Sequence, residues 1–154
     1  MNHVRAVTAV LRRVFAGTLT WGDCRLLFCV SVAEPIALAA LDRGSIRGAR
    51  RLLARLRPFT LAFSGRPPEP RIIWALEARG RWFGSGSTCL GRALVAELLL
   101  ETLESPLTVV IGVAAGADGM RSHAWIERNG HVLVGGDYAR RQYVPLVAWR
   151  SATP

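Results

Sequence analysis

Lysine is absent from this chain of 154 residues, and all 20 basic residues are arginines. Without a side-chain primary amine, Schiff-base chemistry, a pyridoxal phosphate site and a P-loop lysine are excluded. Cysteine is scarce, because Cys24, Cys29 and Cys89 are the only three and form an odd count. This count argues against a disulfide framework and favours a reducing compartment, so we expect a cytoplasmic protein.

Metal-ligand patterns and uninterrupted apolar runs are missing as well. The three histidines form no recognisable zinc spacing with the cysteines, so we expect no metal and no other cofactor. The longest apolar stretch, residues 26–41, contains Glu34 and Pro35. A membrane-spanning helix needs about 20 mostly uncharged residues, and no signal-peptide pattern is visible. We therefore do not expect membrane association.

What the chain does contain is many apolar residues and an uneven charge. Hydrophobic residues make up 51% of the sequence, which is enough to bury a core in one domain, or in a compact core with an extension. The formal net charge is +9. Residues 1–83 hold 14 arginines and 5 acidic residues, whereas residues 84–154 hold 6 of each. The excess positive charge therefore belongs entirely to the first half of the chain.

The first half has the periodicity of helices, expected at residues 4–15, 23–41 and 43–57, with Pro35 breaking or kinking the second. In the third, arginines recur every four residues, at Arg43, Arg47, Arg51 and Arg55. This pattern predicts an amphipathic helix with a cationic outer face. The face is either simply solvated, or it binds an anionic peptide, a protein or a membrane surface. Nucleic acid is not expected as a partner, because no recognition motif accompanies the arginines.

A stretch rich in proline and glycine, from Pro58 to Pro70, predicts a loop or domain boundary. We accordingly divide the chain into a helical, arginine-rich N-terminal region, residues 1–66, and a second unit, residues 67–154. Expected in the second unit are a helix at 71–79, a glycine-rich connector at 80–86, a helix at 90–104, and strands at 108–113, 122–127 and 131–134. The fold class is therefore α+β, with a helix packed on an antiparallel sheet.

Three residues of the second unit suit acyl-transfer chemistry. Cys89 lies at the predicted start of a helix, with Ser87 or Thr88 as its N-cap, where free N–H groups and the helix dipole favour a thiolate and an oxyanion. We expect His123 on a strand and Asp137 at the end of the next strand, after Gly135-Gly136. A cysteine nucleophile, an imidazole base and an orienting carboxylate form a catalytic triad. A buried cysteine is more often an inert apolar residue, which is the interpretation we give to Cys24 and Cys29.

Strand register decides whether Asp137 faces His123. A two-residue hairpin loop at Asn129-Gly130 would put the two side chains on opposite faces of the sheet. A three-residue loop that includes Arg128, or a bulge at Gly135-Gly136, would bring them to one face, and we predict one of these two devices. Asp118 and Glu127 are the fallback orienting carboxylates.

Three segments resemble the transglutaminase-like leader peptidases of lasso-peptide biosynthesis. They are STCLGRALVAELLLE from Ser87, LTVVIGV from Leu107 and HAWIERNGHVLVGGD from His123. The resemblance is strong over about residues 71–140 and looser in the helical first half. It implies a papain-like or transglutaminase-like core in which Cys89 is the nucleophile, His123 the general base and Asp137 the third member. The chain departs from the family pattern at Glu104-Ser105-Pro106, which closes the cysteine helix without the usual basic, glycine-capped end.

The resemblance also implies partners. These enzymes cut the leader from a ribosomally made precursor peptide, beside a small leader-recognition protein and an ATP-dependent cyclase that forms the macrolactam. Trp82 and Trp125 are candidates for an indole N–H donor or a wall of the substrate site, with core packing as the alternative for both. Two other functions stay open, namely an acyltransferase on the same scaffold and a non-catalytic module that binds a partner through its arginines.

Overall fold

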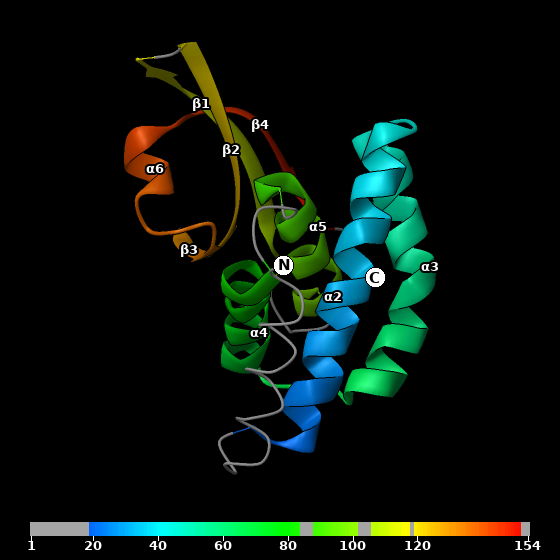
Figure 1. Ribbon diagram of the computed structural model, residues 1–154. Helices are drawn as coiled ribbons and strands as arrows, with labels where there is room; N and C mark the ends of the chain where they lie inside the picture. Colours follow the sequence, from blue (N-terminus) through cyan, green and yellow to red (C-terminus); the bar gives the residue numbers. More distant parts are fainter. Residues whose placement is uncertain (1–18, 84–87, 102–105, 118, 152–154) are drawn as a thin grey trace.

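The structure is a computed structural model that describes residues 19–83, 88–101, 106–117 and 119–151. Its helices and strands are, in chain order, α2 (Trp21–Asp42), α3 (Ile46–Ser64), α4 (Glu69–Phe83), α5 (Cys89–Leu100), β1 (Thr108–Gly116), β2 (Gly119–Arg128), β3 (His131–Val134), α6 (Ala139–Gln142) and β4 (Val144–Arg150) (Figure 1). The helix expected at residues 4–15 lies outside the described residues. The strand predicted at 131–134 is confirmed, and β1 and β2 are longer than predicted.

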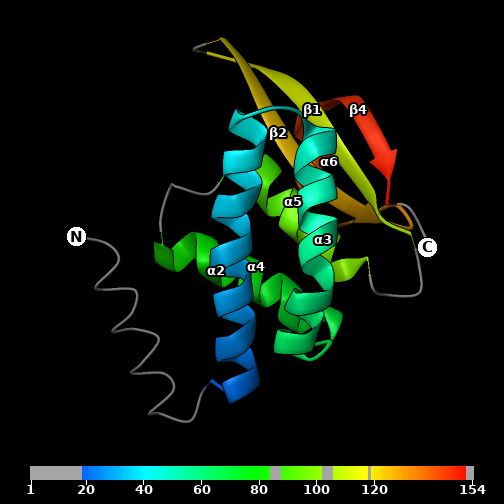
Figure 2. The same ribbon diagram turned by 90° about the vertical axis from the view of Figure 1, so that its right-hand side faces the viewer.

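Helix α5 lies at the centre of the molecule. Figures 1 and 2 show it between the pair α2 and α3 on one side and the sheet on the other. Nearly every residue of α5 from Gly91 onward is buried. A helix that is apolar on all sides is stable only when other elements cover all its sides. The sequence of this segment therefore predicts a core helix.

The sheet has the strand order β3-β2-β1-β4, and all neighbouring strands are antiparallel. Successive residues of a strand point to opposite faces. In β2, Ala124 and Ile126 pack into the main core that contains α5, whereas Trp125 packs on the other face with Val110 and Ala139. The short helix α6 covers this second face (Figure 1). The predicted α+β class, with a helix on an antiparallel sheet, is confirmed.

Two prolines that predicted interruptions lie inside continuous helices. Pro35 is exposed within the 22 residues of α2, and Pro58 is exposed within the 19 residues of α3. A proline removes one backbone hydrogen bond, and here the buried faces of both helices share one core, which offsets the loss. The loop predicted from Pro58 begins only after Gly65, a left-handed residue with φ 72° that ends α3.

Helix α3 also begins later than predicted. Ser45 is its N-cap, and the Ser45 hydroxyl accepts a hydrogen bond from the backbone N–H of Gly48 at 3.2 Å. Arg43 belongs to the C-terminal cap of α2. The prediction that Arg43 lies on the same helix as Arg47, Arg51 and Arg55 is therefore wrong.

Helix α2 is the one helix among the described residues that is long and apolar enough to cross a membrane, by length and composition alone. It carries two buried carboxylates, Asp23 and Glu34, and Glu34 lies 3.6 Å from the guanidinium of Arg79 on α4. Leu26, Val30 and the other buried residues of α2 belong to the same core as α3, α4 and α5. These contacts are those of a core helix in a folded domain.

Candidate active site

Cys89 is the first residue of α5. The Thr88 hydroxyl accepts a hydrogen bond from the backbone N–H of Gly91 at 3.0 Å. Of the two candidates, Ser87 and Thr88, the N-cap is therefore Thr88. Gly91 allows this end of α5 to pack closely on α2, because a Cβ there would lie 2.9 Å from a methyl group of Leu38. The Cys89 side chain is half-buried, at a helix start where backbone N–H groups remain free for an anion.

His123 lies on β2 and is held by a hydrogen bond and by aromatic rings. Its Nε2 is 2.7 Å from the carbonyl oxygen of Gly135. A carbonyl oxygen only accepts, so Nε2 carries the proton and Nδ1 is the basic nitrogen of the neutral ring. The rings of Tyr138 and Tyr143 lie with their centroids 5.8 Å and 5.0 Å from that of His123. The imidazole therefore has a fixed orientation and a defined tautomer.

Cys89 and His123 line the same pocket, which has a volume of about 190 Å³. It lies beyond the end of β3, where the strand pairing stops at Ile126 and Val134 and the chain after β3 passes beside Ala124 and His123. The pocket is also lined by side chains and backbone of α4, α5, β2 and the segment after β3, namely Glu77, Arg92, Ala124, Val134, Gly135, Gly136 and Tyr138. Cys89 and His123 are 34 residues apart in the sequence, and the fold brings them to one pocket.

The hairpin between β2 and β3 has a two-residue loop. Arg128 pairs with His131 across Asn129-Gly130, and the register shifts so that Leu133 is the extra residue of a bulge. The three-residue loop and the bulge at Gly135-Gly136 that we predicted are both wrong. A bulge is present, but it lies one residue inside the end of β3.

Asp137 does not lie on a strand. Gly135 and Gly136 have φ values of 111° and 88°, which turn the chain away after Val134, and Asp137 falls in the turn before α6. A Cβ on Gly135 would lie 2.9 Å from the Cα of Trp125, so only glycine fits there. Asp137 is exposed and does not line the pocket. Its role as the third member stays a prediction, and the partner of His123 in the structure is the Gly135 carbonyl.

The fallback carboxylates do not replace Asp137 in the described part of the chain. Glu127 accepts the indole N–H of Trp125 at 2.6 Å and lies 3.3 Å from Nε of Arg140. Asp118 lies outside the described residues.

Of the two tryptophans proposed for the substrate site, the structure describes the side chain of Trp125 and not that of Trp82. Trp125 is fully buried and its indole N–H is taken by Glu127, so it packs in the core behind His123 and offers no donor to a substrate. Trp82 lies in the last turn of α4, and its side chain is outside the described part of the structure.

The other two cysteines have a different environment. Burial raises the pKa of the Cys29 thiol, which lies 3.9 Å from the carbonyl of Thr60. Burial and the charge of Asp23 raise the pKa of Cys24. A raised pKa favours the neutral thiol in both. Cys29 is buried, as expected of a core cysteine, whereas Cys24 is partly exposed. Within the described residues, no group of three or more His, Cys, Asp or Glu side chains is arranged to hold a metal ion.

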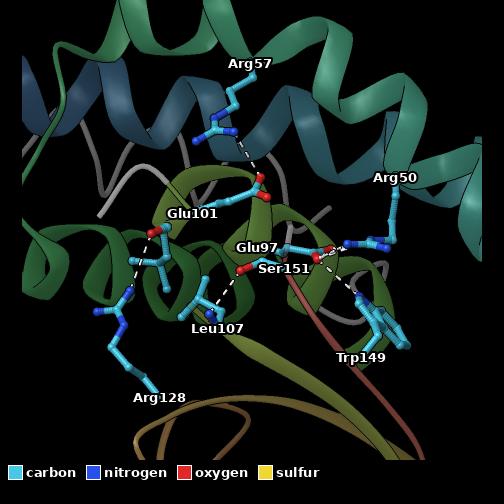
Figure 3. A network of polar contacts seen from close by, with 9 residues as sticks. Arg50, Arg57, Glu97, Glu101, Leu107, Arg128, Trp149 and Ser151 are labelled. Carbon is cyan, nitrogen blue, oxygen red and sulfur yellow. Dashed lines mark hydrogen bonds and ion pairs between the residues drawn. The ribbon is translucent and has the colours of Figure 1, made fainter. Parts of the chain in front are cut away.

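The arginines of α3 fall into two sets. Arg47, Arg51 and Arg55 are exposed, as the sequence predicted. Arg50 and Arg57, which the pattern did not single out, point inward, Arg50 to Glu97 of α5 at 2.6 Å and Arg57 to Glu101, the C-cap of α5, at 3.1 Å (Figure 3). The pocket between α3 and α5 is larger, about 340 Å³, and Arg47 and Arg51 line it together with Glu97 and Glu101. Among the described residues, it has no cysteine or histidine in its lining, whereas the smaller pocket has both.

Sequence reasoning missed three residues that hold His123. The Gly135 carbonyl, Tyr138 and Tyr143 come from the segment after β3, whose path depends on the bulge and the two glycines. The pair Gly135-Gly136 beside an aromatic residue was the available signal, because adjacent glycines indicate a sharp change of direction. Glu77 and Arg92, which complete the pocket wall, carry no local signal of this kind.

A thiol at a helix N-terminus that shares a pocket with an imidazole on an adjacent sheet is an arrangement that suits cysteine–histidine acyl-transfer chemistry. Residues 30–148 match the transglutaminase-like superfamily, so the chain belongs to this family. No curated protein and no solved structure matches the chain. The match begins at residue 30 and therefore includes α3 and most of α2 as well as the second half of the chain. Helices α2 and α3 also share a core with α5. The division of the chain into residues 1–66 and 67–154 stays a prediction.

Proposed function

We propose that this protein is a cysteine peptidase that removes the leader from a ribosomally made lasso-peptide precursor. The observation that carries the proposal is the shared pocket of Cys89 and His123. Membership of the transglutaminase-like superfamily, which includes cysteine peptidases and acyltransferases, supports the chemistry. The resemblance of the segments from Ser87, Leu107 and His123 to leader peptidases supports the substrate.

The first half-reaction is acylation. Nδ1 of His123 takes the proton of the Cys89 thiol, and the thiolate attacks the carbonyl carbon at the leader–core junction. The backbone N–H of Cys89 stabilises the oxyanion as a carbon–sulfur bond forms. The tetrahedral intermediate then collapses, the carbon–nitrogen bond breaks, and the imidazolium of His123 protonates the departing amine of the core peptide.

The second half-reaction is hydrolysis. His123 takes a proton from water, whose oxygen attacks the thioester of the leader on Cys89. The carbon–sulfur bond breaks, the leader leaves as a carboxylic acid, and the imidazolium of His123 returns its proton to the Cys89 sulfur, which restores the thiol and the neutral imidazole. Throughout, the hydrogen bond from Nε2 to the Gly135 carbonyl oxygen leaves Nδ1 as the nitrogen that exchanges protons.

The partners and the location belong to the same proposal. The precursor peptide is the substrate, a small leader-recognition protein supplies much of the affinity for the leader, and an ATP-dependent cyclase consumes the released core. The cysteine count supports a cytoplasmic location, since three cysteines argue against a disulfide framework. No cofactor is needed, because cysteine and histidine supply both the nucleophile and the proton transfers.

The direct test is mass spectrometry of a precursor peptide incubated with the purified chain and its recognition protein. We expect free leader and free core with the wild-type chain, and none above background with Cys89→Ala, because no other group replaces the nucleophile. The matched control is Cys24→Ala, which removes a cysteine outside the pocket and is expected to leave cleavage intact. Processing that survives in Cys89→Ala would refute the assignment.

The same spectra separate hydrolysis from acyl transfer, the alternative that the superfamily allows. Free leader acid indicates hydrolysis, whereas a leader joined to an amine indicates transfer. A non-catalytic binding module is tested by alkylation. An activated Cys89 reacts with iodoacetamide quickly near neutral pH, and a slow reaction with no pH dependence would favour the binding module.

A further inference from the structure

A row of exposed side chains crosses α3 obliquely, from the pocket that α3 shares with α5 to the groove that it shares with α2. It consists of residues spaced by four, Arg47, Arg51, Arg55, Phe59 and Phe63, which we call the α3 ridge. Residues four apart on a helix are neighbours, and the 16 steps from Arg47 to Phe63 span about 24 Å at 1.5 Å each. All five are exposed, and 73% of Phe59 is accessible to solvent. The ridge is therefore cationic in its first part and aromatic in its second.

The positive charge of the ridge is not balanced within the described structure. Helix α3 has five arginines and no acidic residue. Arg50 and Arg57 are neutralised by the α5 carboxylates Glu97 and Glu101. The three ridge arginines have no acidic partner among the described residues, and like charges four residues apart repel each other. Repulsion of this kind is relieved when an anionic group binds.

The aromatic part of the ridge borders an apolar groove between α2 and α3. Phe59 and Phe63 line it together with Phe28 and Val32 of α2, and its volume is about 190 Å³. The rings of Phe28 and Phe63 are 5.6 Å apart, and the guanidinium of Arg25 lies 4.9 Å from the centre of the Phe63 ring. Figures 1 and 2 show no described element outside α3 on this side. Exposed aromatic residues around a hollow are typical of a binding surface.

We propose that the α3 ridge binds a helical segment of an acidic protein partner. Carboxylates of the segment pair with Arg47, Arg51 and Arg55, and its apolar side chains enter the groove beside Phe59. The ridge crosses α3 obliquely, as ridges spaced by four residues do, and this is the common geometry of helix-on-helix packing. A hollow receives side chains, whereas a membrane-binding face inserts protruding ones, so the groove favours a protein over a lipid surface. This surface lies apart from the pocket of Cys89 and does not depend on the proposed peptidase activity.

The test uses the full chain and an 18-residue synthetic helix as the probe. The peptide carries glutamate at every fourth position in one half and leucine at every fourth position in the other, and a second peptide has lysine in place of glutamate. Affinity is measured by fluorescence anisotropy at 50 mM and 500 mM NaCl. We expect binding of the glutamate peptide alone, weakened at high salt because screening acts on exposed charges.

Charge reversal on the ridge, Arg47→Glu with Arg51→Glu and Arg55→Glu, should weaken binding by about tenfold or more. The matched control reverses three exposed arginines elsewhere, Arg121→Glu with Arg141→Glu and Arg150→Glu, and should bind like wild type. Removing the aromatic part, Phe59→Ala with Phe63→Ala, should weaken binding at both salt concentrations. Circular dichroism establishes that each variant is folded.

Three outcomes would overturn the proposal. They are equal affinity of the ridge and control variants, no binding of the glutamate peptide, and ridge-dependent binding to vesicles with 30% phosphatidylglycerol in place of the peptide. The third outcome would assign the ridge to a membrane surface. None of these measurements depends on cleavage, so a failure here is distinct from a failure of the peptidase assignment.

Discussion

The two ends of α5 differ in what surrounds them. At the N-terminal end, Cys89 is half-buried and borders a pocket with His123. In the C-terminal half, Glu97 is only 5% exposed and accepts hydrogen bonds from Arg50 of α3 and from the indole N–H of Trp149 of β4, the latter at 3.1 Å (Figure 3). The N-terminal end thus carries a thiol that borders a pocket. The C-terminal half carries a carboxylate that is hydrogen-bonded to protein side chains.

This difference indicates how Cys89, the proposed nucleophile, is held in place. Glu97 joins α5 to a helix on one side and to the sheet on the other, so that the position of α5 is fixed by contacts away from the site. A reactive group is most accurately placed when it lies on a rigid element supported by other contacts. We therefore expect changes at the Cys89 end to affect activity and changes at the Glu97 end to affect stability.

The largest effect on the site side is expected from His123→Ala. It removes the base and the proton donor, so cleavage of the precursor should fall by about 10²- to 10⁴-fold, while the melting temperature changes little. The matched control is His131→Ala, which removes an exposed histidine in the hairpin and should leave the rate unchanged. The rates are measured by chromatography of the released leader. A rate close to wild type in His123→Ala would show that the pocket is not the catalytic site.

On the structural side, Glu97→Ala should lower the free energy of unfolding by about 3–5 kcal/mol, because Arg50 loses its partner and the Trp149 N–H loses its acceptor. Urea denaturation measures this value. Glu97→Gln keeps an acceptor and should lose less. As a control, Glu77→Ala breaks an exposed pair with Arg81 and should cost about 1 kcal/mol or less. A loss at Glu97 no larger than that at Glu77 would break the comparison between the two ends.

A smaller effect is expected from Asp137→Asn. Because the Gly135 carbonyl already fixes the tautomer of His123, we expect the rate of cleavage to fall by about tenfold or less. The measurement is the pH dependence of kcat/KM for this variant beside that of the wild type. A loss as large as that of His123→Ala would mean that the carboxylate reaches the imidazole during turnover, as the leader-peptidase resemblance implies.

The smallest effect is expected at Glu101. Burial raises the pKa of this carboxyl group above its ordinary value of 4.5, and the charge of Arg57 partly counteracts the shift. A raised pKa means that the folded state binds the proton more tightly. The stability that Glu101 contributes is therefore present below pH 4.5 and is lost as the pH rises through the raised value. Urea denaturation from pH 4 to 7 should show a shallower pH dependence for Glu101→Gln, and an unchanged dependence would contradict the assignment.

Much of the fold could be predicted from local patterns. The apolar run after Cys89 predicted a core helix, the β-branched segments predicted strands, and Asn129-Gly130 predicted a hairpin turn, all of which the structure contains. Local patterns failed where tertiary packing outweighed a local cost. Pro35 and Pro58 are typical helix breakers, yet both helices continue through them because their other faces are buried.

For the site, the sequence by itself determined that a cysteine begins a helix and that a histidine lies on a strand, since N-cap residues and alternation act over a few neighbouring residues. Only the tertiary structure decided that these two residues share a pocket, that a carbonyl orients the imidazole, and which arginines of α3 are neutralised. The reason is physical: a local rule is satisfied within one turn or one strand, whereas these contacts join residues far apart in the chain. Their geometry depends on strand register, on a bulge and on how the helices pack.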